Sequence, residues 1–225
     1  MESTEKPAVV HHLRDGTPVR LRLIGPADRA QLAAGFEKLS RESRYRRFFT
    51  AMPTLPDRML DRLVATDGWK HVAIGAELAS DDPAGAEGLG VARFIRLDDA
   101  PDVAEVAVAV VDAKQKLGLG SLLLRELVEA ARERGIHRFR AMMLAENSPA
   151  RALMEDLGEE VSVRRENGYL VYEIILPERT EEPPKGNVLE RLLKLAAGGV
   201  QFVFRVVGGS DAEHDDAPDE PPKAP

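Results

Sequence analysis

Apolar residues take every second position of Pro18–Ile24, and arginines lie between them, which predicts a half-buried strand. Six later segments have the apolar composition of strands and are bounded by turn or helix signals. These segments are His71–Leu78, Gly88–Leu97, Val103–Val111, Phe139–Ala145, Val161–Arg165 and Tyr169–Leu176. The dipeptide Asn167-Gly168 separates the last two and is typical of a tight hairpin turn.

Helix signals lie between these strands, where proline, aspartate, serine or asparagine precedes an apolar stripe of helical spacing. The predicted helices are Pro26–Leu39, Leu55–Ala65, one that begins at Ser121 and ends before Gly135, and Asn147–Leu157. The resulting order, β-α-α-β-β-β-α-β-α-β-β, predicts an α/β fold.

The central segment Val103–Leu124 joins a strand, a glycine-containing turn and a helix. The first amides of a helix have no partner within it, and the helix dipole favours an anion there. Gly118 and Gly120 let a ligand approach the backbone, and Lys116 adds a positive charge. The residues alone leave two interpretations open, a phosphate-binding turn and a purely structural strand–helix connection.

The turn matches neither the P-loop nor the dinucleotide-binding glycine pattern. Gln115, Gly118 and Gly120 instead resemble the acyl-CoA loop of the GNAT acetyltransferases, Gln/Arg-x-x-Gly-x-Gly/Ala. The resemblance extends over about Gly16–Leu176 and implies a mixed, strongly twisted sheet with helices on both faces. It also implies acetyl-CoA as cosubstrate, with its pyrophosphate bound by the loop residues Gln115, Lys116, Leu117, Gly118, Leu119, Gly120 and Ser121.

The same resemblance implies two further contacts with acetyl-CoA. The pantetheine arm is expected to pair with backbone atoms of Val108, Val110 and Val111 in the central strand. Asn147 corresponds to an asparagine that helps to bind the cosubstrate in the family. The residue alone equally fits a helix N-cap, for which asparagine is favoured.

Glu105 is the candidate general base. An amine must lose a proton when it is acetylated, and a carboxylate can take that proton directly or through a water molecule. Glu105 is the one acidic residue within the apolar central strand Val103–Val111, and a partly buried carboxylate is a stronger base than an exposed one. The alternative is that Glu105 faces solvent. The GNAT resemblance favours the catalytic role, because lysine-modifying members have a glutamate in this strand.

Met154 departs from the family pattern. Many GNAT acetyltransferases have a tyrosine there, whose hydroxyl protonates the departing thiolate, and methionine has no proton to donate. The departing thiolate is then expected to leave unassisted or to take a proton from water, unless catalysis is weak.

The segment Ser40–Phe49 places four arginines between three aromatic residues. One interpretation, which the residues favour, is a helix end with exposed arginines and a buried aromatic pair. The other is a lip over the substrate groove. The segment, with Leu39 before it, also resembles the signature Leu-Ser-x-Glu-Ser-Arg-Tyr-x-Arg-Phe-Phe of bacterial protein-lysine acetyltransferase domains. This resemblance implies a protein lysine as acceptor.

Composition narrows the function further. The net charge of −7 argues against nucleic acid as a partner. The absence of cysteine excludes disulfides and thiolate catalysis, and the five histidines show no metal-ligand spacing, so no metal site is expected. The sequence shows neither a signal peptide nor a membrane-spanning segment, so we expect a soluble cytoplasmic protein.

Composition also predicts the domain organisation. A flexible N-terminal arm, 1–14, precedes the acetyltransferase domain, 15–178, and a linker follows, 179–187. The apolar segment 188–207 has the pattern of a helix followed by a strand, and 208–225 that of a disordered acidic, proline-rich tail. We expect 188–207 to pack within the chain or to form a homodimer rather than to contact a membrane, because it has little basic excess.

Three functions remain open on the sequence: acetylation of a protein lysine, acetylation of a small-molecule amine, and acyl-CoA binding without catalysis. The first rests on the glycine loop, Glu105 and the segment Ser40–Phe49. Met154 and the segment 188–207 motivate the third. Acceptor choice depends on variable loops, so the sequence does not separate the first two.

Overall fold

One eight-stranded mixed sheet, in the order β1-β2-β3-β4-β5-β6-β8-β7, forms the centre of the protein. The computed structural model describes residues 9–80 and 86–178. Neighbouring strands are antiparallel except for β5 and β6, which are parallel. The strands are β1 (Val10–His12), β2 (Pro18–Leu23), β3 (His71–Leu78), β4 (Gly88–Arg96), β5 (Val103–Val110), β6 (Arg138–Leu144), β7 (Glu160–Glu166) and β8 (Tyr169–Ile175).

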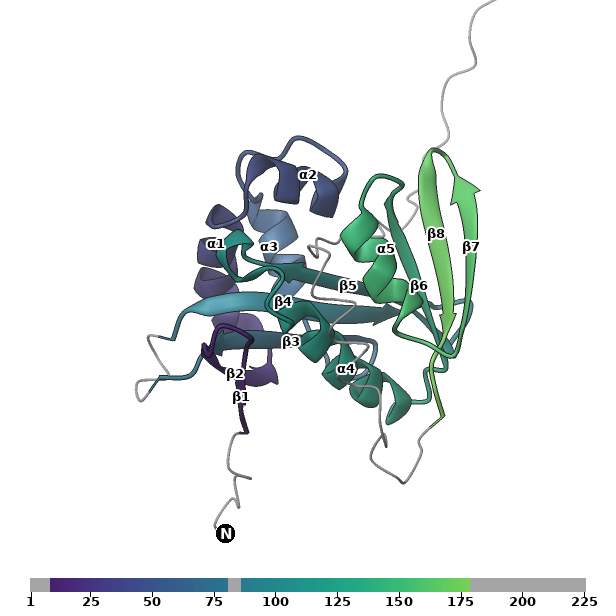
Figure 1. The fold of residues 1–225 in the computed structure, drawn as a ribbon, viewed down its shortest axis with the longest axis horizontal. Coiled ribbons are helices and arrows are strands. Elements are labelled where there is room, and N and C mark those ends of the chain that lie inside the picture. Colours follow the sequence, from purple (N-terminus) through teal and green to yellow (C-terminus); the bar gives the residue numbers. More distant parts are fainter. Residues whose placement is uncertain (1–8, 81–85, 179–225) are drawn as a thin grey trace, which may run out of the picture.

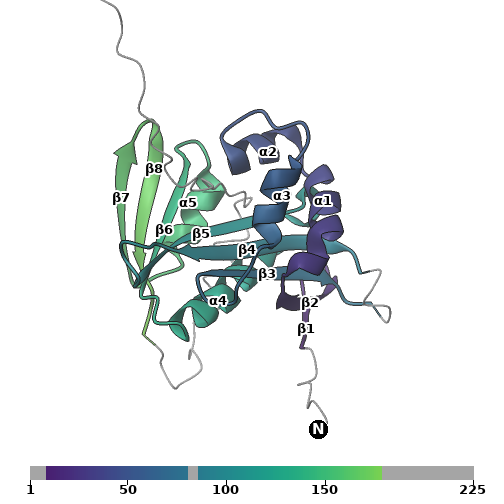
Figure 2. The same cartoon turned by 180° about the vertical axis from the view of Figure 1, so that it is seen from behind.

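Helices cover both faces of this sheet. In Figure 1, α4 and α5 lie in front of the strands and α1 and α3 lie behind them, and Figure 2 shows the reverse side. The described part of the chain thus confirms the predicted α/β fold with a strongly twisted mixed sheet. The helices are α1 (Arg29–Glu37), α2 (Arg41–Phe48), α3 (Asp57–Val64), α4 (Leu119–Arg132) and α5 (Ser148–Glu155).

The apolar core lies mainly between α4 and the middle strands. Leu123, Leu124 and Leu127 of α4 are fully buried, as the helical spacing of apolar residues predicts. On the sheet, the rings of Phe94 and Phe139 lie 6.3 Å apart and join β4 to β6 across β5. This packing fixes the start of α4 against the end of β5, which is where the glycine loop lies.

The predicted strands agree with the observed ones to within one or two residues, and the hairpin turn is confirmed by positive φ at Asn167 (48°) and Gly168 (85°). The prediction of a loose arm was wrong for Val10–His12, which pair with β2 as a short edge strand. A three-residue strand is too short to show alternation, so its residues carry no sequence signal for it. The segments 179–187, 188–207 and 208–225 lie outside the described residues.

The favoured interpretation of Ser40–Phe49 was also wrong. It is a separate helix, α2, whose N-cap is Ser40: the Ser40 side chain accepts a hydrogen bond from the Ser43 amide. Of its four arginines only Arg41 is exposed and Arg47 is buried, while Phe48 and Phe49 are half-buried. The Arg47 guanidinium lies 4.8 Å from the Phe48 ring centre, so an aromatic face covers part of the charged group.

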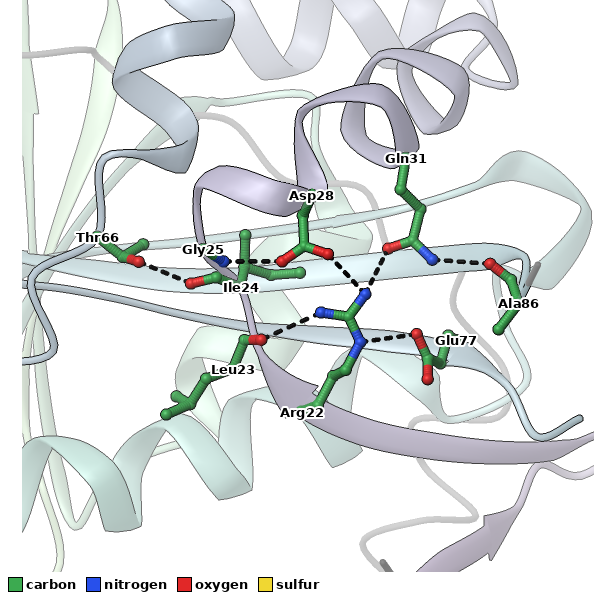
Figure 3. A network of polar contacts seen from close by, with 9 residues as sticks. All are labelled: Arg22, Leu23, Ile24, Gly25, Asp28, Gln31, Thr66, Glu77 and Ala86. Atoms are coloured by element: carbon green, nitrogen blue, oxygen red, sulfur yellow. Dashed lines mark hydrogen bonds and ion pairs between the residues drawn. The ribbon is translucent and has the colours of Figure 1, made fainter. Parts of the chain in front are cut away.

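Arg22 of β2 fixes the entry to α1 (Figure 3). Its guanidinium donates to Asp28 Oδ1 at 2.7 Å, Glu77 Oε2 at 2.8 Å and Gln31 Oε1 at 2.9 Å. Asp28 in turn accepts from the Gly25 amide at 2.8 Å. One side chain therefore joins β2, β3 and the first turn of α1, which positions the helices behind the sheet.

We expect Leu123→Ala to lower the free energy of unfolding by about 2–5 kcal/mol, because it leaves a cavity in the core. Leu23→Ala is the matched control, since Leu23 is 60% exposed and its truncation should cost less than about 1 kcal/mol. Urea unfolding measures both values. Equal losses in the two variants would contradict the packing of α4 on the sheet.

Asp28 supplies a pH-dependent part of the stability. Burial raises the pKa of its carboxyl, but hydrogen bonds from Arg22 and the Gly25 amide lower it more, so the pKa falls below its ordinary value of 3.8. The ionised carboxyl therefore stabilises the fold above pH 3.8, and this contribution is lost as the pH falls through the folded-state pKa.

We expect Asp28→Asn to lower the free energy of unfolding by about 1–2 kcal/mol at pH 7, with the difference from the wild type shrinking toward pH 3. Urea unfolding at several pH values measures this difference. A difference that is independent of pH would show that the charge of Asp28 is not what matters.

Candidate functional site

The strands β5 and β6 pair over three residues only, from Val103 opposite Arg138 to Glu105 opposite Arg140. Within the described residues the two strands have no paired residues beyond Glu105, and Figure 1 shows β6 turning away from β5. Glu105 thus lies at the point where the sheet opens. Past this point the edge of β5 that faces β6 can pair with an extended ligand.

The hydrogen bonds around Val111 show which backbone groups face the opening. The Val111 amide donates to the Leu89 carbonyl at 2.9 Å, and the Val111 carbonyl accepts from the Lys114 amide at 2.9 Å. Successive residues of a strand direct their backbone groups to opposite sides, so those of Val108 and Val110 point away from β4 and toward the opening. Val111 therefore does not fit its predicted role with pantetheine, whereas Val108 and Val110 lie on the expected edge.

The glycine loop leads directly into α4. Lys116 and Gly118 have φ values of 64° and 89°, and the Leu122 amide donates to the Gly118 carbonyl at 3.1 Å as the helix begins. The helix starts at Leu119, two residues before the predicted start at Ser121. Gly120 therefore lies inside the first turn, and of the two glycines only Gly118 needs positive φ.

The first amides of α4 are those of Leu119, Gly120 and Ser121, which have no hydrogen-bond acceptor within the helix. They meet at the same end of the helix as Lys116. This arrangement fits a pyrophosphate, because the amides donate and the helix dipole favours negative charge.

Asp112 joins the glycine loop to α2. Its carboxylate accepts from the Ser43 hydroxyl at 2.7 Å, the Ser40 amide at 3.1 Å and the Gln115 side chain at 3.0 Å. The same Gln115 amide group also donates to the Val110 carbonyl at 3.1 Å. The two serines of the segment Ser40–Phe49 thus hold the loop in place, and Gln115 links the loop to the end of β5.

A groove of about 560 Å³ opens on the face of the sheet that carries α1 and α3, and Glu105 lines it. At the end of α2, Phe49 adopts φ 56°, and its ring meets Tyr169 edge-on at 4.5 Å. Phe48 and Phe49, at the end of the segment Ser40–Phe49, therefore form a lip of this groove, in agreement with the second interpretation. That the groove takes a substrate stays a prediction. The lining residues are Phe48, Phe49, Thr50, Met52, Met59, Glu105, Arg140, Met142, Arg164, Glu166, Asn167, Tyr169 and Val171.

Charges of both signs lie along the groove. Glu105 is partly buried and lines the groove, and its role as general base stays a prediction. Arg140 donates to Glu173 Oε1 at 2.7 Å, and Arg164 donates to the same oxygen at 3.3 Å. The sequence reasoning missed Arg140 and Tyr169, because only the register of the paired strands places both on the face that carries Glu105.

A smaller cavity of about 80 Å³ separates α1 and α2 from β3 and β4. Arg47 and Arg93 line it, and both are buried. Burial lowers the pKa of Arg93 to about 10, and burial together with the charge of Arg93 lowers the pKa of Arg47 to about 9. Arg93 donates to the Leu63 carbonyl at 2.7 Å, which ties α3 to the sheet.

Asn147 is fully buried and forms the N-cap of α5, since its side chain accepts from the Ala150 amide at 3.4 Å. The structural interpretation of this residue is confirmed, and its contact with the cosubstrate stays a prediction. Met154 is buried in the core. The buried Tyr172 does not replace a tyrosine at that position, because its hydroxyl bonds Arg151 and Glu155 on another side of α5.

No group of three or more acidic or histidine side chains could hold a metal ion in residues 9–80 and 86–178. Over the same ranges, none of the helices has the length and apolar character needed to cross a membrane.

Replacing Asp112 by alanine should disturb both the loop and α2, because Ser43, Ser40 and Gln115 each lose one hydrogen bond. We expect Asp112→Ala to lower the free energy of unfolding by about 1–3 kcal/mol, whereas Asp99→Ala, at an exposed turn, should change it by less than about 0.5 kcal/mol. Chemical denaturation of both variants makes the comparison. A loss no larger than that of Asp99→Ala would show that Asp112 does not hold the two segments together.

Comparison with known proteins gives consistent results. The sequence model described as "Acetyltransferase (GNAT) family" matches residues 41–158. The chain is 30% identical over 181 residues to "Acetyltransferase Pat" of Mycolicibacterium smegmatis, which covers 80% of this chain but only 52% of that protein. It is also 30% identical to "Acetyltransferase PA5475" of Pseudomonas aeruginosa, covering 66% of this chain and 78% of that protein.

Among solved structures, the GNAT domain of the S. lividans protein PAT superposes with a TM-score of 0.68 and 32% identity. The alignment covers 78% of this chain and all of that domain (100%). The residues matched by the family model, 41–158, include Glu105 and the glycine loop.

Proposed function

The chain belongs to the acetyltransferase (GNAT) family, whose members use acetyl-CoA as cosubstrate, and we propose that it acetylates a lysine side chain of another protein with Glu105 as general base. The observation that carries this proposal is the position of Glu105. It lies where β5 and β6 part and lines the groove, on the face of the sheet opposite α4.

The geometry suits a reaction between two substrates that arrive from opposite faces. The amides of Leu119–Ser121 and the edge of β5 at Val108 and Val110 are the groups that would hold acetyl-CoA. The acceptor amine would enter through the groove and reach the same opening beside Glu105. Placing the amine beside the thioester supplies much of the rate acceleration, because it removes the entropic cost of their encounter.

In the proposed step the amine nitrogen attacks the thioester carbonyl carbon, a C–N bond forms, and the C–S bond breaks. The carboxylate of Glu105 takes the proton that the amine loses, directly or through water. This proton transfer matters because a lysine amine, with an ordinary pKa near 10.4, is almost fully protonated at neutral pH. The thiolate takes its proton from water, since Met154 is buried and has no proton to donate.

A protein acceptor is supported by the charge of the groove and by the segment at its rim. Glu105 and Glu166 favour an approaching ammonium group, while Arg140 and Arg164 lie beside them. The segment Ser40–Phe49, which resembles the signature of protein-lysine acetyltransferases, forms the lip through Phe48 and Phe49.

A small-molecule amine is the second candidate, because about 560 Å³ is within the usual range for small-ligand sites. An acyl-CoA synthetase, spermidine and an aminoglycoside, each supplied at the same amine concentration with radiolabelled acetyl-CoA, separate the two candidates. Faster labelling of the protein supports the proposal, and labelling of the small amines alone replaces it with the second candidate. Tight binding of acetyl-CoA with no labelling of any acceptor would point to a non-catalytic module.

We expect Glu105→Gln to lower kcat by about 10²–10⁴-fold with little change in acetyl-CoA affinity. The remaining activity should rise with pH, because only an amine that is already neutral then reacts. Steady-state rates between pH 6 and 9 test both expectations. Glu129→Gln, an exposed change on α4, is the matched control and should leave kcat unchanged. Equal rates for Glu105→Gln and the wild type would remove Glu105 from its role.

A further inference from the structure

The hairpin between β1 and β2 lies against the glycine loop, although about a hundred residues separate them in sequence. The Arg14 amide donates to the Leu117 carbonyl at 3.2 Å, and Arg14 Nη1 donates to the Lys116 carbonyl at 3.3 Å. Lys114 secures the other side of the hairpin, because its Nζ donates to Asp15 at 3.0 Å and to Thr17 Oγ1 at 2.7 Å. Four hydrogen bonds thus hold the hairpin on the loop.

This docking places the Arg14 guanidinium beside the start of α4. A Cβ atom added at Gly118 would lie 4.0 Å from Arg14 Nε, and Gly118 is the residue from which α4 begins. Arg14 itself is exposed, so its charged group lies at the surface of the loop rather than beneath it.

A guanidinium in this position adds to the positive potential at the start of α4. The N-terminus of a helix carries partial positive charge, so the two together favour an anion there. Lys116 adds a second cation to the same loop.

We propose that Arg14 binds a phosphate group of the CoA nucleotide, next to the amides at the start of α4. A guanidinium has five N–H donors in a planar fork, so a bond from Nη1 to the Lys116 carbonyl is compatible with a two-point contact to phosphate. The negative charge of the phosphate would lie beside the positive guanidinium and the partial positive charge of the helix N-terminus. This role rests on acetyl-CoA binding at the same loop, as in the proposed function.

Arg14→Gln tests the role, because glutamine can still donate to the Lys116 carbonyl but carries no charge. Calorimetric titration with CoA should show affinity about 10–100-fold lower than for the wild type. Acetyl-pantetheine, which lacks the nucleotide, should bind both proteins equally, and the thermal unfolding midpoint should not change. Arg125→Met, which removes an exposed arginine further along α4, is the charge control and should bind CoA like the wild type.

A second ligand, 3′-dephospho-CoA, identifies the phosphate. If Arg14 contacts the 3′-phosphate, 3′-dephospho-CoA binds Arg14→Gln and the wild type equally. If it contacts the pyrophosphate, Arg14→Gln loses affinity for CoA and for 3′-dephospho-CoA by the same factor. Either pattern supports the proposal.

Arg14→Gln with the CoA affinity of the wild type would show that Arg14 only fastens the hairpin and would overturn the proposal. Lower affinity for acetyl-pantetheine as well as for CoA would also overturn it, because the loop itself would then be disturbed. In either case a wild type that binds CoA and acetylates an acceptor leaves the proposed function standing. If the wild type binds no CoA, both the role of Arg14 and the proposed function are wrong.

Discussion

The short pairing between β5 and β6 is the constraint on which the rest of the structure depends. The two strands share three residue pairs and then separate at Glu105. Burial of α4 against β3, β4 and β5 holds one side of the opening, and packing of α5 against β6 and β8 holds the other. Because both sides are fixed by apolar packing, the opening is a permanent part of the fold and needs no ligand to form.

The sequence predicted this architecture well, because its main signals are local. The glycine loop, the apolar periodicity of α4 and the Asn167-Gly168 turn each specify a backbone conformation from neighbouring residues. The helix start was placed two residues late, because Gly120 was assigned to the turn although helical φ suits glycine equally well. Membership of the GNAT family followed from the same local segments.

The parts that the sequence did not predict depend on contacts between distant segments. Arg47 was expected at the surface because its side chain is charged, yet the packing of α2 over the sheet buries it. Arg140 and Tyr169 reach the groove only through the order of strands in the sheet. The contact of Arg14 with the glycine loop and the bonds from Asp112 to α2 join residues whose spacing along the chain carries no signal.

The buried arginine pair under α2 has a consequence for the motion of the protein. Arg47 repels Arg93, and both are desolvated, so moving α2 away from the sheet relieves an unfavourable interaction, which partly offsets the packing energy that this movement gives up. We therefore expect local opening of this helix to cost less than that of α4, whose inner face is uniformly apolar. Phe48 and Phe49 lie at the end of α2 and line the groove. Amide hydrogen exchange should therefore be faster in α2 than in the strands that line the groove. An acceptor would then meet a mobile rim above rigid strands.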